Sequence, residues 1–587
     1  MKTTTGILAG LICAAAIATT AGCGRKSASS GPDTANPPVA LAAQAADTIY
    51  TGGDIITVND AQPAVEALAV KDGKILAVGS RGEIEQAHKG SATKIVDLGG
   101  KVLLPAFIDA HSHYINSLTV ANQAKVYAPP AGPGKDVPSI VEAIEKFRVE
   151  RKVPKGELIQ AYGYDDSVMP GGRLLNRDDL DQAFPDNPVL VGHVSMHGAV
   201  LNSAALKKFG ISAATPTPSG GVIVRKPGTN EPYGLIMEMA YLPVFGSLPK
   251  PTREQEVEWT RAGQMLYAES GITLAQEGAT HLDDLEIMQR ATAAGANVID
   301  VVAYPFMTDL EKIVAANPAS GWGKYDRHFK IGGAKITVDG SPQGRTAYFT
   351  TPYLTGGPGG EKSWRGEPAM SQDALNKLFK AVYDMNVPLL VHDNGDAAID
   401  MVLQAYAFAR GGDYSRPWNV TTIHTQFLRK NQIPLLVKYK IRPSFYTLHT
   451  FYFAAAHKKN RGDAQAAYIS PMRDAIDAGM HPTNHSDFYV APLDQMFMMW
   501  SAVNRVPREG GVLGPDQRVT PMEALKAQTI WAAEQYDEQD RRGSLEPGKI
   551  ADLVILDRNP LKVEPLSIKD IKVLETVKEG KAIYTRK

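Results

Sequence analysis

The stretch Lys101-Val-Leu-Leu-Pro-Ala-Phe-Ile-Asp-Ala-His111-Ser-His113 is a mostly apolar run that ends on two histidines one residue apart. Such a run is typical of a strand buried on both faces, as in a parallel sheet. Side chains at positions i and i+2 of a strand point to the same side, so the two imidazoles should be presented together. Neutral imidazole is a common ligand of divalent metals such as zinc. The stretch therefore predicts half of a metal site, although a histidine taken singly is more often an ordinary core or surface residue.

Beyond this stretch, short apolar strands alternate with helical patterns along the middle of the chain. The predicted strands include residues 271–276, 298–304, 335–339, 388–392 and 420–424. Strands that alternate with helices indicate βα units and a parallel sheet. Several of these strands end on a polar residue, and a (β/α)8 barrel builds its active site at the carboxyl ends of its strands. We therefore predict an α/β fold of the TIM-barrel type.

Both ends of the folded region show short strands separated by turn signals instead. Asp72-Gly73 lies between two alternating apolar runs, which is a strong hairpin signal. Chain termini often lie close together. We therefore predict a small β-sandwich domain built from residues 47–103 and 536–587, on either side of a barrel spanning residues 104–535.

The composition is that of an ordinary soluble globular protein. Of 587 residues, 44% are hydrophobic and 21% are charged, with 62 basic residues against 63 acidic ones. This near-neutral balance gives no sign of nucleic-acid binding or of a strongly charged substrate. The length indicates more than one domain.

The first residues differ from the rest of the chain, because Lys2 is followed by an uncharged run of small and apolar residues. Residues 1–22 read as an export signal, and Thr20-Ala-Gly-Cys23 resembles the lipobox of bacterial lipoproteins, with Thr20 where a large aliphatic residue is usual. An uncleaved membrane anchor is the alternative, although the run is short for a full span. We expect a periplasmic or cell-surface lipoprotein, anchored to a membrane through lipidated Cys23. Residues 23–46 would form a flexible tether.

Two further strands end on histidine. His392 closes Leu389-Leu-Val-His and His424 closes Thr421-Thr-Ile-His. Each could be a structural histidine, but with the first pair they lie in the right order for one barrel mouth. Near the end of the barrel region, Asp487 in Asn484-His-Ser-Asp offers a carboxylate that could bind metal and accept a proton, whereas an aspartate in a loop is usually a cap or turn former.

At this point the chain resembles the amidohydrolase superfamily, and within it the YtcJ-like branch that includes N-substituted formamide deformylases. The resemblance extends from about Asp47 to the end of the chain and includes an enlarged insertion at about residues 120–260. The motifs that carry it are Leu104-Pro-Ala-Phe-Ile-Asp-Ala-His-Ser-His113, Lys335-Ile-Thr-Val-Asp-Gly-Ser-Pro-Gln-Gly-Arg-Thr-Ala347, Val391-His-Asp-Asn-Gly-Asp396, Ser486-Asp487 and Gly543-Ser-Leu-Glu-Pro-Gly-Lys-Ile-Ala-Asp-Leu-Val554.

The resemblance implies one or two divalent metal ions in the barrel. It implies these six ligands: His111, His113, Lys335, His392, His424 and Asp487. Lys335 would be carboxylated and bridge two ions, whereas a lysine at a strand end could also simply face solvent. Asp487 would also be the general base for a water whose pKa the metal lowers to about 7. Zinc is favoured by histidine-rich ligation, while manganese, iron, cobalt and nickel are compatible with it.

Other candidates are supported more weakly. The resemblance makes His197 and Arg345 candidates for a substrate contact or for oxyanion stabilisation, although each is more often structural. Tyr162, Tyr164 and Asp165 form an aromatic and acidic cluster that could line a pocket.

Two positions depart from the pattern of the branch. Ile423 stands where a glutamate usually precedes the strand-six histidine, so that carboxylate is missing or is supplied elsewhere. His485 stands where relatives commonly have glycine, which places an extra imidazole near Asp487. His449, His457 and His481 are expected to be surface or packing residues.

These features predict a metal-dependent hydrolase that cleaves an amide-type carbon–nitrogen bond of a small molecule, with a formamide or an N-acyl compound as the first choice of substrate. The same site could cleave an ester or a lactone, because hydroxide attack on an activated carbonyl is common to both. A non-catalytic binding or regulatory lipoprotein is the alternative of another class. No nucleic-acid partner is expected, and a homo-oligomer stays open.

Overall fold

The computed structural model describes residues 44–194, 198–218, 221–249, 251–358 and 361–587. The predicted export signal, Cys23 and nearly all of the predicted tether therefore lie outside the described residues. The chain divides into two units, Met1–Gln44 and Ala45–Lys587, and the second contains every helix and strand given below. Among the described residues, no helix is both long enough and apolar enough to cross a membrane.

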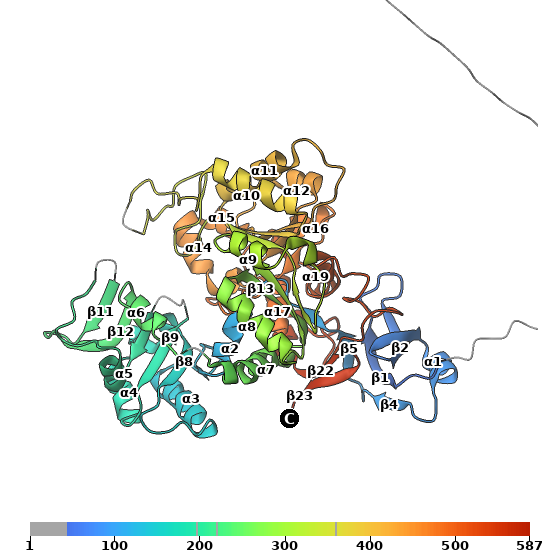
Figure 1. Ribbon diagram of the computed structural model, residues 1–587, viewed down its shortest axis with the longest axis horizontal. Helices are drawn as coiled ribbons and strands as arrows, with labels where there is room; N and C mark the ends of the chain where they lie inside the picture. Colours follow the sequence, from blue (N-terminus) through green and yellow to red (C-terminus); the bar gives the residue numbers. More distant parts are fainter. Residues whose placement is uncertain (1–43, 195–197, 219–220, 250, 359–360) are drawn as a thin grey trace, which may run out of the picture. The chain divides into compact units, whose positions relative to one another are not determined.

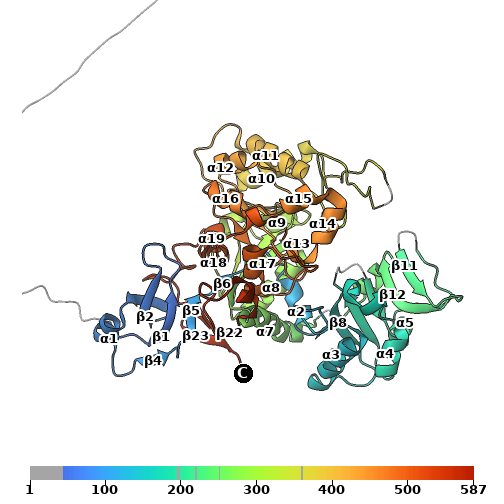
Figure 2. The ribbon, with the colours of Figure 1, turned by 180° about the vertical axis from the view of Figure 1, so that it is seen from behind.

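Strands from both ends of the second unit form one eight-stranded sheet, in the order β23-β22-β21-β5-β1-β2-β3 with β4 also paired to β1. Its strands are β1 Thr48–Ile56, β2 Ala64–Lys71, β3 Lys74–Gly79, β4 Lys94–Asp97, β5 Val102–Pro105, β21 Leu553–Leu556, β22 Val573–Lys578 and β23 Lys581–Thr585. Figure 1 and Figure 2 both show β22 and β23 beside β5.

The predicted hairpin is present, since Asp72 and Gly73 have φ of 49° and 75° and join the antiparallel β2 and β3. The end strand β3 also contacts the segment just before β21, where the amide of Ile75 donates to the carbonyl of Lys549 at 2.9 Å. The sheet is therefore curled. The predicted sandwich is therefore a single bent sheet built from both chain ends, with a core that includes Leu68, Leu103 and Leu553.

The barrel consists of eight parallel strands that carry the site at their carboxyl ends. In order they are β6 Phe107–Ile108, β13 Ile272–Thr280, β14 Asp300–Pro305, the broken strand β15 Phe329–Ile331 with β16 Ala334–Thr337, β17 Leu389–Asp393, β18 Val420–His424, β19 Arg442–Phe445 and β20 Thr483–Asn484. Two parallel bridges, Phe306 to Lys335 and Ser112 to Phe488, close the ring.

The fourth barrel strand is interrupted at Gly332 and Gly333, where neighbouring strands approach closely. A Cβ atom on Gly333 would lie 2.2 Å from the carbonyl oxygen of Pro388, and one on Gly332 would lie 2.4 Å from a side-chain carbon of Val302. Only glycine fits these two positions, so the backbone can bend there and bring Lys335 inward.

Helices follow most of the barrel strands and cover the ring. They are α7 Arg253–Glu269, α8 Leu282–Ala293, α9 Leu310–Ala316, α10 Gln372–Met385, α11 Asp396–Arg410, α12 Ile433–Tyr439, α13 His449–Tyr452, α14 Ala454–Arg461, α15 Asp463–Ala467, α16 Met472–Asp477, α17 Gln495–Asn504, α18 Pro521–Lys526 and α19 Ile530–Gln535. Apolar side chains fill the barrel interior beneath the site, among them Ile108, Leu274, Val302 and Ile423. This packing gives the ligand candidates a rigid base.

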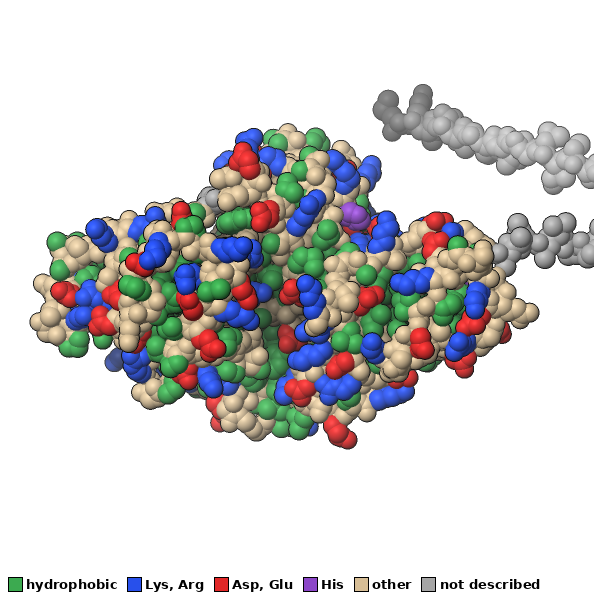
Figure 3. Space-filling view, turned by 90° about the horizontal axis from the view of Figure 1, so that it is seen from below, with side chains coloured by type: hydrophobic (Ala, Val, Ile, Leu, Met, Phe, Trp, Pro, Cys, Tyr) green, Lys and Arg blue, Asp and Glu red, His purple; other side chains and the backbone are tan. Residues whose placement is uncertain are grey.

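The insertion has a six-stranded sheet of its own, in the order β11-β12-β10-β9-β8-β7. Its elements are β7 Ala124–Lys125, α3 Val137–Glu150, β8 Ile159–Tyr164, α4 Arg177–Ala183, β9 Val189–His193, β10 Gly198–Leu201, α5 Ser203–Lys208, β11 Gly221–Arg225, β12 Pro232–Glu238 and α6 Leu242–Gly246. Two remaining helices are α1 Arg81–His88 and α2 Ile115–Val120. On the face seen in Figure 3, acidic and basic side chains are interspersed, in keeping with the near-neutral net charge.

Candidate metal centre

The six predicted ligands all lie at or just beyond the carboxyl ends of barrel strands. They are His111 and His113 after β6, Lys335 in β16, His392 in β17, His424 at the end of β18 and Asp487 after β20. Parallel strands place their carboxyl ends at one edge of a barrel, which brings residues far apart in the sequence to one mouth.

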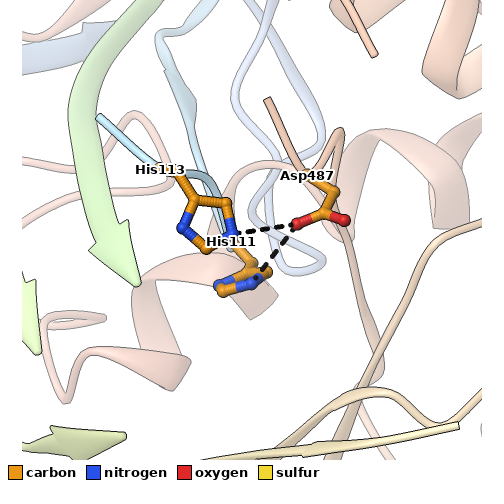
Figure 4. Close-up of side chains that lie close together, drawn as sticks. All are labelled: His111, His113 and Asp487. Atoms are coloured by element: carbon orange, nitrogen blue, oxygen red, sulfur yellow. Dashed lines mark ion pairs between the residues drawn. The ribbon is translucent and has the colours of Figure 1, made fainter. Parts of the chain in front are cut away.

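Three of these side chains form a compact group (Figure 4). His111, His113 and Asp487 each offer one ligand atom, and these atoms all lie within 4.8 Å of one another. The Nε2 atom of each histidine lies 3.5 Å from Oδ1 of Asp487. That oxygen is buried and has no hydrogen-bond partner within the described part of the chain. A buried carboxylate oxygen without a donor is costly, so this arrangement fits a cation held between the three side chains.

Lys335 lies beside this group. Its Nζ is 3.5 Å from Nε2 of His111, and its side chain is buried. Burial lowers the pKa of the Lys335 amine to about 8, although the charge of nearby carboxylates such as Asp487 raises it and offsets part of this effect. The amine is therefore easier to deprotonate than that of an exposed lysine, as carboxylation by carbon dioxide would require.

His392 and His424 form the second part of the site. Their rings lie 4.6 Å apart between centroids, and the ring of His424 is 5.6 Å from that of His111. Burial lowers the pKa of His392 to about 3 and that of His424 well below its usual value. Both imidazoles are thus neutral at neutral pH, which is the form that binds metal.

Gln276, in β13, orients the first histidine. Its Nε2 donates to the carbonyl of Ala110 at 2.9 Å and lies 2.8 Å from the hydroxyl of Tyr536. Its Oε1 is therefore left to accept from Nδ1 of His111, 2.7 Å away. With the proton on Nδ1, the lone pair of Nε2 faces Asp487, as a metal ligand requires. Sequence reasoning missed Gln276, whose only signal was a polar residue within a buried strand.

Backbone conformation also sets the ligand directions. His424 and Asp487 have φ of 73° and 53°, and Thr425 has φ of 45°. Such left-handed conformations cost on the order of 1–3 kcal/mol each for non-glycine residues and cluster at functional sites. Backbone hydrogen bonds hold them here, from Thr425 to Asp393 at 2.7 Å and from Asp487 to His111 at 3.2 Å.

Asp339 ties the loop after β16 to the loop after β17. Its carboxylate accepts from the backbone amides of Tyr348, Asn394 and Gly395 at 2.8–2.9 Å. Burial outweighs these hydrogen bonds and raises the pKa of Asp339 to about 7. The aspartate of the Asp-Gly-Ser motif therefore supports the loops beside His392, 3.7 Å from its Nε2.

The structure describes four of the five weaker candidates. His197 is outside the described residues. Arg345 lies in the loop after β16, with Nη1 3.5 Å from the carbonyl of Gly356, and no hydrogen bond found among the described residues joins it to a predicted ligand. Tyr162 contacts the strand-eight loop, since its hydroxyl lies 3.4 Å from the carbonyl of Tyr489. The hydroxyl of Tyr164 accepts from the amide of Leu175 at 3.0 Å, inside the insertion.

Asp165 lies at the junction of the insertion and the barrel, where its carboxylate is 3.0 Å from Nη1 of Arg508.

The three histidines that were expected to be structural do lie away from the ligands. His449 and His457 are buried, with their rings stacked, and His481 pairs with Glu534 at 2.8 Å.

Tyr446 is a side chain of the site that sequence reasoning missed. It follows β19, is almost fully buried, and stacks on the ring of His485 with centroids 5.5 Å apart. Within the described part of the chain its hydroxyl has no hydrogen-bond partner. Burial and the negative charge of Asp487 raise its pKa well above the usual value, so the hydroxyl keeps its proton.

Gly278 supplies the space that the ring of His111 occupies. A Cβ atom at this position would lie 2.3 Å from Cε1 and 2.6 Å from Nδ1 of His111. We expect Gly278→Ala to displace this imidazole and to weaken metal binding by about 10–100-fold, the range seen when the support of a ligand is lost. Competition with a chelator measures the effect. Gly82→Ala, at an exposed position with open space, is the control, and unchanged affinity in Gly278→Ala would contradict the prediction.

Comparison with known proteins decides the family. Residues 94–584 match the model of the Amidohydrolase family. The chain belongs to the amidohydrolase family. YtcJ of Bacillus subtilis (strain 168) is 27% identical over 552 residues, covering 92% of this chain and 99% of YtcJ. The N-substituted formamide deformylase of Arthrobacter pascens is 26% identical over 558 residues, covering 92% and 99%.

The solved structures agree with this amidohydrolase fold. The crystal structure of a metal-dependent hydrolase from Pyrococcus horikoshii OT3 superposes with a TM-score of 0.67 at 22% identity, covering 88% of this chain and 99% of the other. The predicted family and the predicted barrel with a second, β-rich domain are thus confirmed. As a member of its family, this amidohydrolase is a metal-dependent hydrolase.

Proposed function

We propose that this amidohydrolase cleaves the carbon–nitrogen bond of a small, non-peptide amide, with a formamide or another N-acyl compound as its substrate. The observation that carries the proposal is the buried Oδ1 of Asp487, which lacks a hydrogen-bond donor and lies 3.5 Å from two imidazole nitrogens. The likeness to a formamide deformylase over 92% of the chain supports the choice of substrate class.

The donor set fits a divalent metal. His111, His113 and Asp487 would hold one ion, His392 and His424 a second, and a carboxylated Lys335 would bridge the two. Two neutral imidazoles with a carboxylate favour zinc. When bound, the metal lowers the pKa of a water to about 7 and polarises a carbonyl oxygen.

The residues of this chain would carry the proton transfers. Burial works against ionisation of Asp487, but the nearby His113 and Lys335 side chains hold its pKa below the usual value. The carboxylate is therefore ready at neutral pH to take a proton from the attacking water and return it to the leaving nitrogen. The protonated hydroxyl of Tyr446 has no hydrogen-bond partner within the described part of the chain and would be available to donate to the substrate.

Elemental analysis and substrate hydrolysis, followed on the same samples, test the proposal. Wild type would be compared with His111→Ala, Lys335→Ala and the control His481→Ala, using a panel of formamides, N-acyl amines, esters and lactones. We expect about two metal ions per chain, amide cleavage preferred over ester cleavage, and loss of both metal and activity in the first two variants.

Other results would change the assignment. One ion per chain, lost only in His111→Ala, would indicate a mononuclear site. Faster cleavage of esters or lactones would replace the amide substrate. No metal in any sample, even after reconstitution, would contradict hydrolysis at this site and support a binding protein.

A further inference from the structure

His485, one of the two positions that depart from the pattern of the resembled branch, lies beside His424 in the structure. His424 follows Ile423, where a glutamate would be usual, and Nδ1 of His424 lies 3.0 Å from Nε2 of His485. We propose that His485 is a positioning residue, which fixes the tautomer and ring direction of His424 and so takes the place of the missing carboxylate. The proposal rests on the proposed function, in which His424 binds metal.

The contacts of His485 suit this role. Its side chain is fully buried, and its other ring nitrogen, Nδ1, lies 2.9 Å from Oγ of Ser444 in β19. Tyr446 stacks on the ring from one side, with an interplanar angle of 21°. Both ring nitrogens are therefore engaged, and the ring cannot turn without losing two hydrogen bonds in a buried place.

These contacts allow one proton arrangement in which His424 can bind metal through Nε2. The proton of His424 must then lie on Nδ1 and be donated to Nε2 of His485. His485 must in turn carry its proton on Nδ1 and donate it to the hydroxyl oxygen of Ser444, which can accept it. In this arrangement the chain from Ser444 through His485 holds the tautomer of His424 that leaves Nε2 free.

The surroundings of position 423 explain why the support comes from another strand. Ile423 is fully buried in the apolar interior of the barrel, with Ile108, Leu274 and Leu390. A carboxylate there would have to be desolvated among apolar side chains. His485 approaches from β20 instead, and as a neutral acceptor it supports the ligand without a second negative charge near Asp487.

Metal affinity and the visible spectrum of the cobalt-substituted full-length protein test this inference without relying on turnover. In His485→Leu, which removes the acceptor, we expect the Kd for Zn²⁺ to rise about 10–100-fold and the cobalt absorption bands to shift. In His485→Gln, whose amide oxygen can accept from His424, Kd should stay within a few-fold of wild type. His457→Leu removes another buried histidine, whose ring contacts Phe427, His449 and Phe453, and is the matched control.

The outcomes separate the two proposals. Wild-type affinity and an unchanged cobalt spectrum in His485→Leu would overturn the role of His485 while leaving the hydrolase assignment intact. A wild-type protein that binds no metal would overturn both. If circular dichroism shows that His485→Leu does not fold, Ser444→Ala decides: a weaker affinity supports the relay, and an unchanged affinity overturns it.

Discussion

Asp487→Asn should lower kcat/KM by about 10²–10⁴-fold, the contribution typical of a positioned general base. An amide has nearly the shape of the carboxylate but cannot take the proton of the attacking water at neutral pH. It also places a neutral group 3.5 Å from the nitrogens of His111 and His113. Steady-state kinetics on the best amide of the panel, with metal content measured on the same protein, would show the loss.

Asp494→Asn provides the matched control for this prediction. Asp494 is an exposed aspartate that caps α17 by accepting from the amide of Phe497 at 2.9 Å. Asparagine caps helices as well as aspartate does, so folding and turnover should both be preserved. Turnover of Asp487→Asn close to that of wild type, at normal metal content, would remove Asp487 from the proposed role.

Arg542→Ala should lower the free energy of unfolding by about 3–5 kcal/mol, because it would leave buried carboxylates without their main cation. Arg542 is almost fully buried and lies 2.6 Å from Asp300 of β14, 2.8 Å from Glu538 and 3.4 Å from Asp552, next to β21. The same cation thus joins the barrel to the sheet formed by the chain ends. Burial would lower its pKa, but the charge of Asp300 and its neighbours raises it well above the usual value, so the guanidinium stays charged.

Urea denaturation at 25 °C followed by circular dichroism would measure this change. Arg542→Lys should recover only part of the loss, since one ammonium cannot reproduce the fork of guanidinium N–H groups that faces separate carboxylates. Arg558→Ala, at an exposed arginine paired with Asp557 at 3.4 Å, should change stability by no more than about 0.5 kcal/mol. A similarly small effect of Arg542→Ala would show that Lys578, 2.9 Å from Asp300, is sufficient for these carboxylates.

The central strands were predictable because they are buried on both faces and read as continuous apolar runs. The segments 388–392 and 420–424 predicted β17 and β18 almost to the residue, with the histidines at their ends. The apolar run that begins at Lys101 predicted one strand, which the structure divides into β5 and β6. The strand β20 contains two residues, too few for a periodic signal, and pairing with a neighbouring strand defines it. The interruption at Gly332 likewise reflects crowding by Val302 of another strand, which no local pattern encodes.

The sequence by itself determined the family, the barrel and the order of the six candidate ligands. Each candidate lies in or near a segment whose apolar residues predict a strand, and the barrel strands follow one another in chain order. Tertiary structure alone decided how those ligands are held. Gln276 is 165 residues from His111, and His485 is 61 residues from His424, yet each forms the hydrogen bond that selects a ring nitrogen. Hydrogen bonds act over about 3 Å, so residues this distant in sequence influence one another only after the barrel closes and brings its strand ends together.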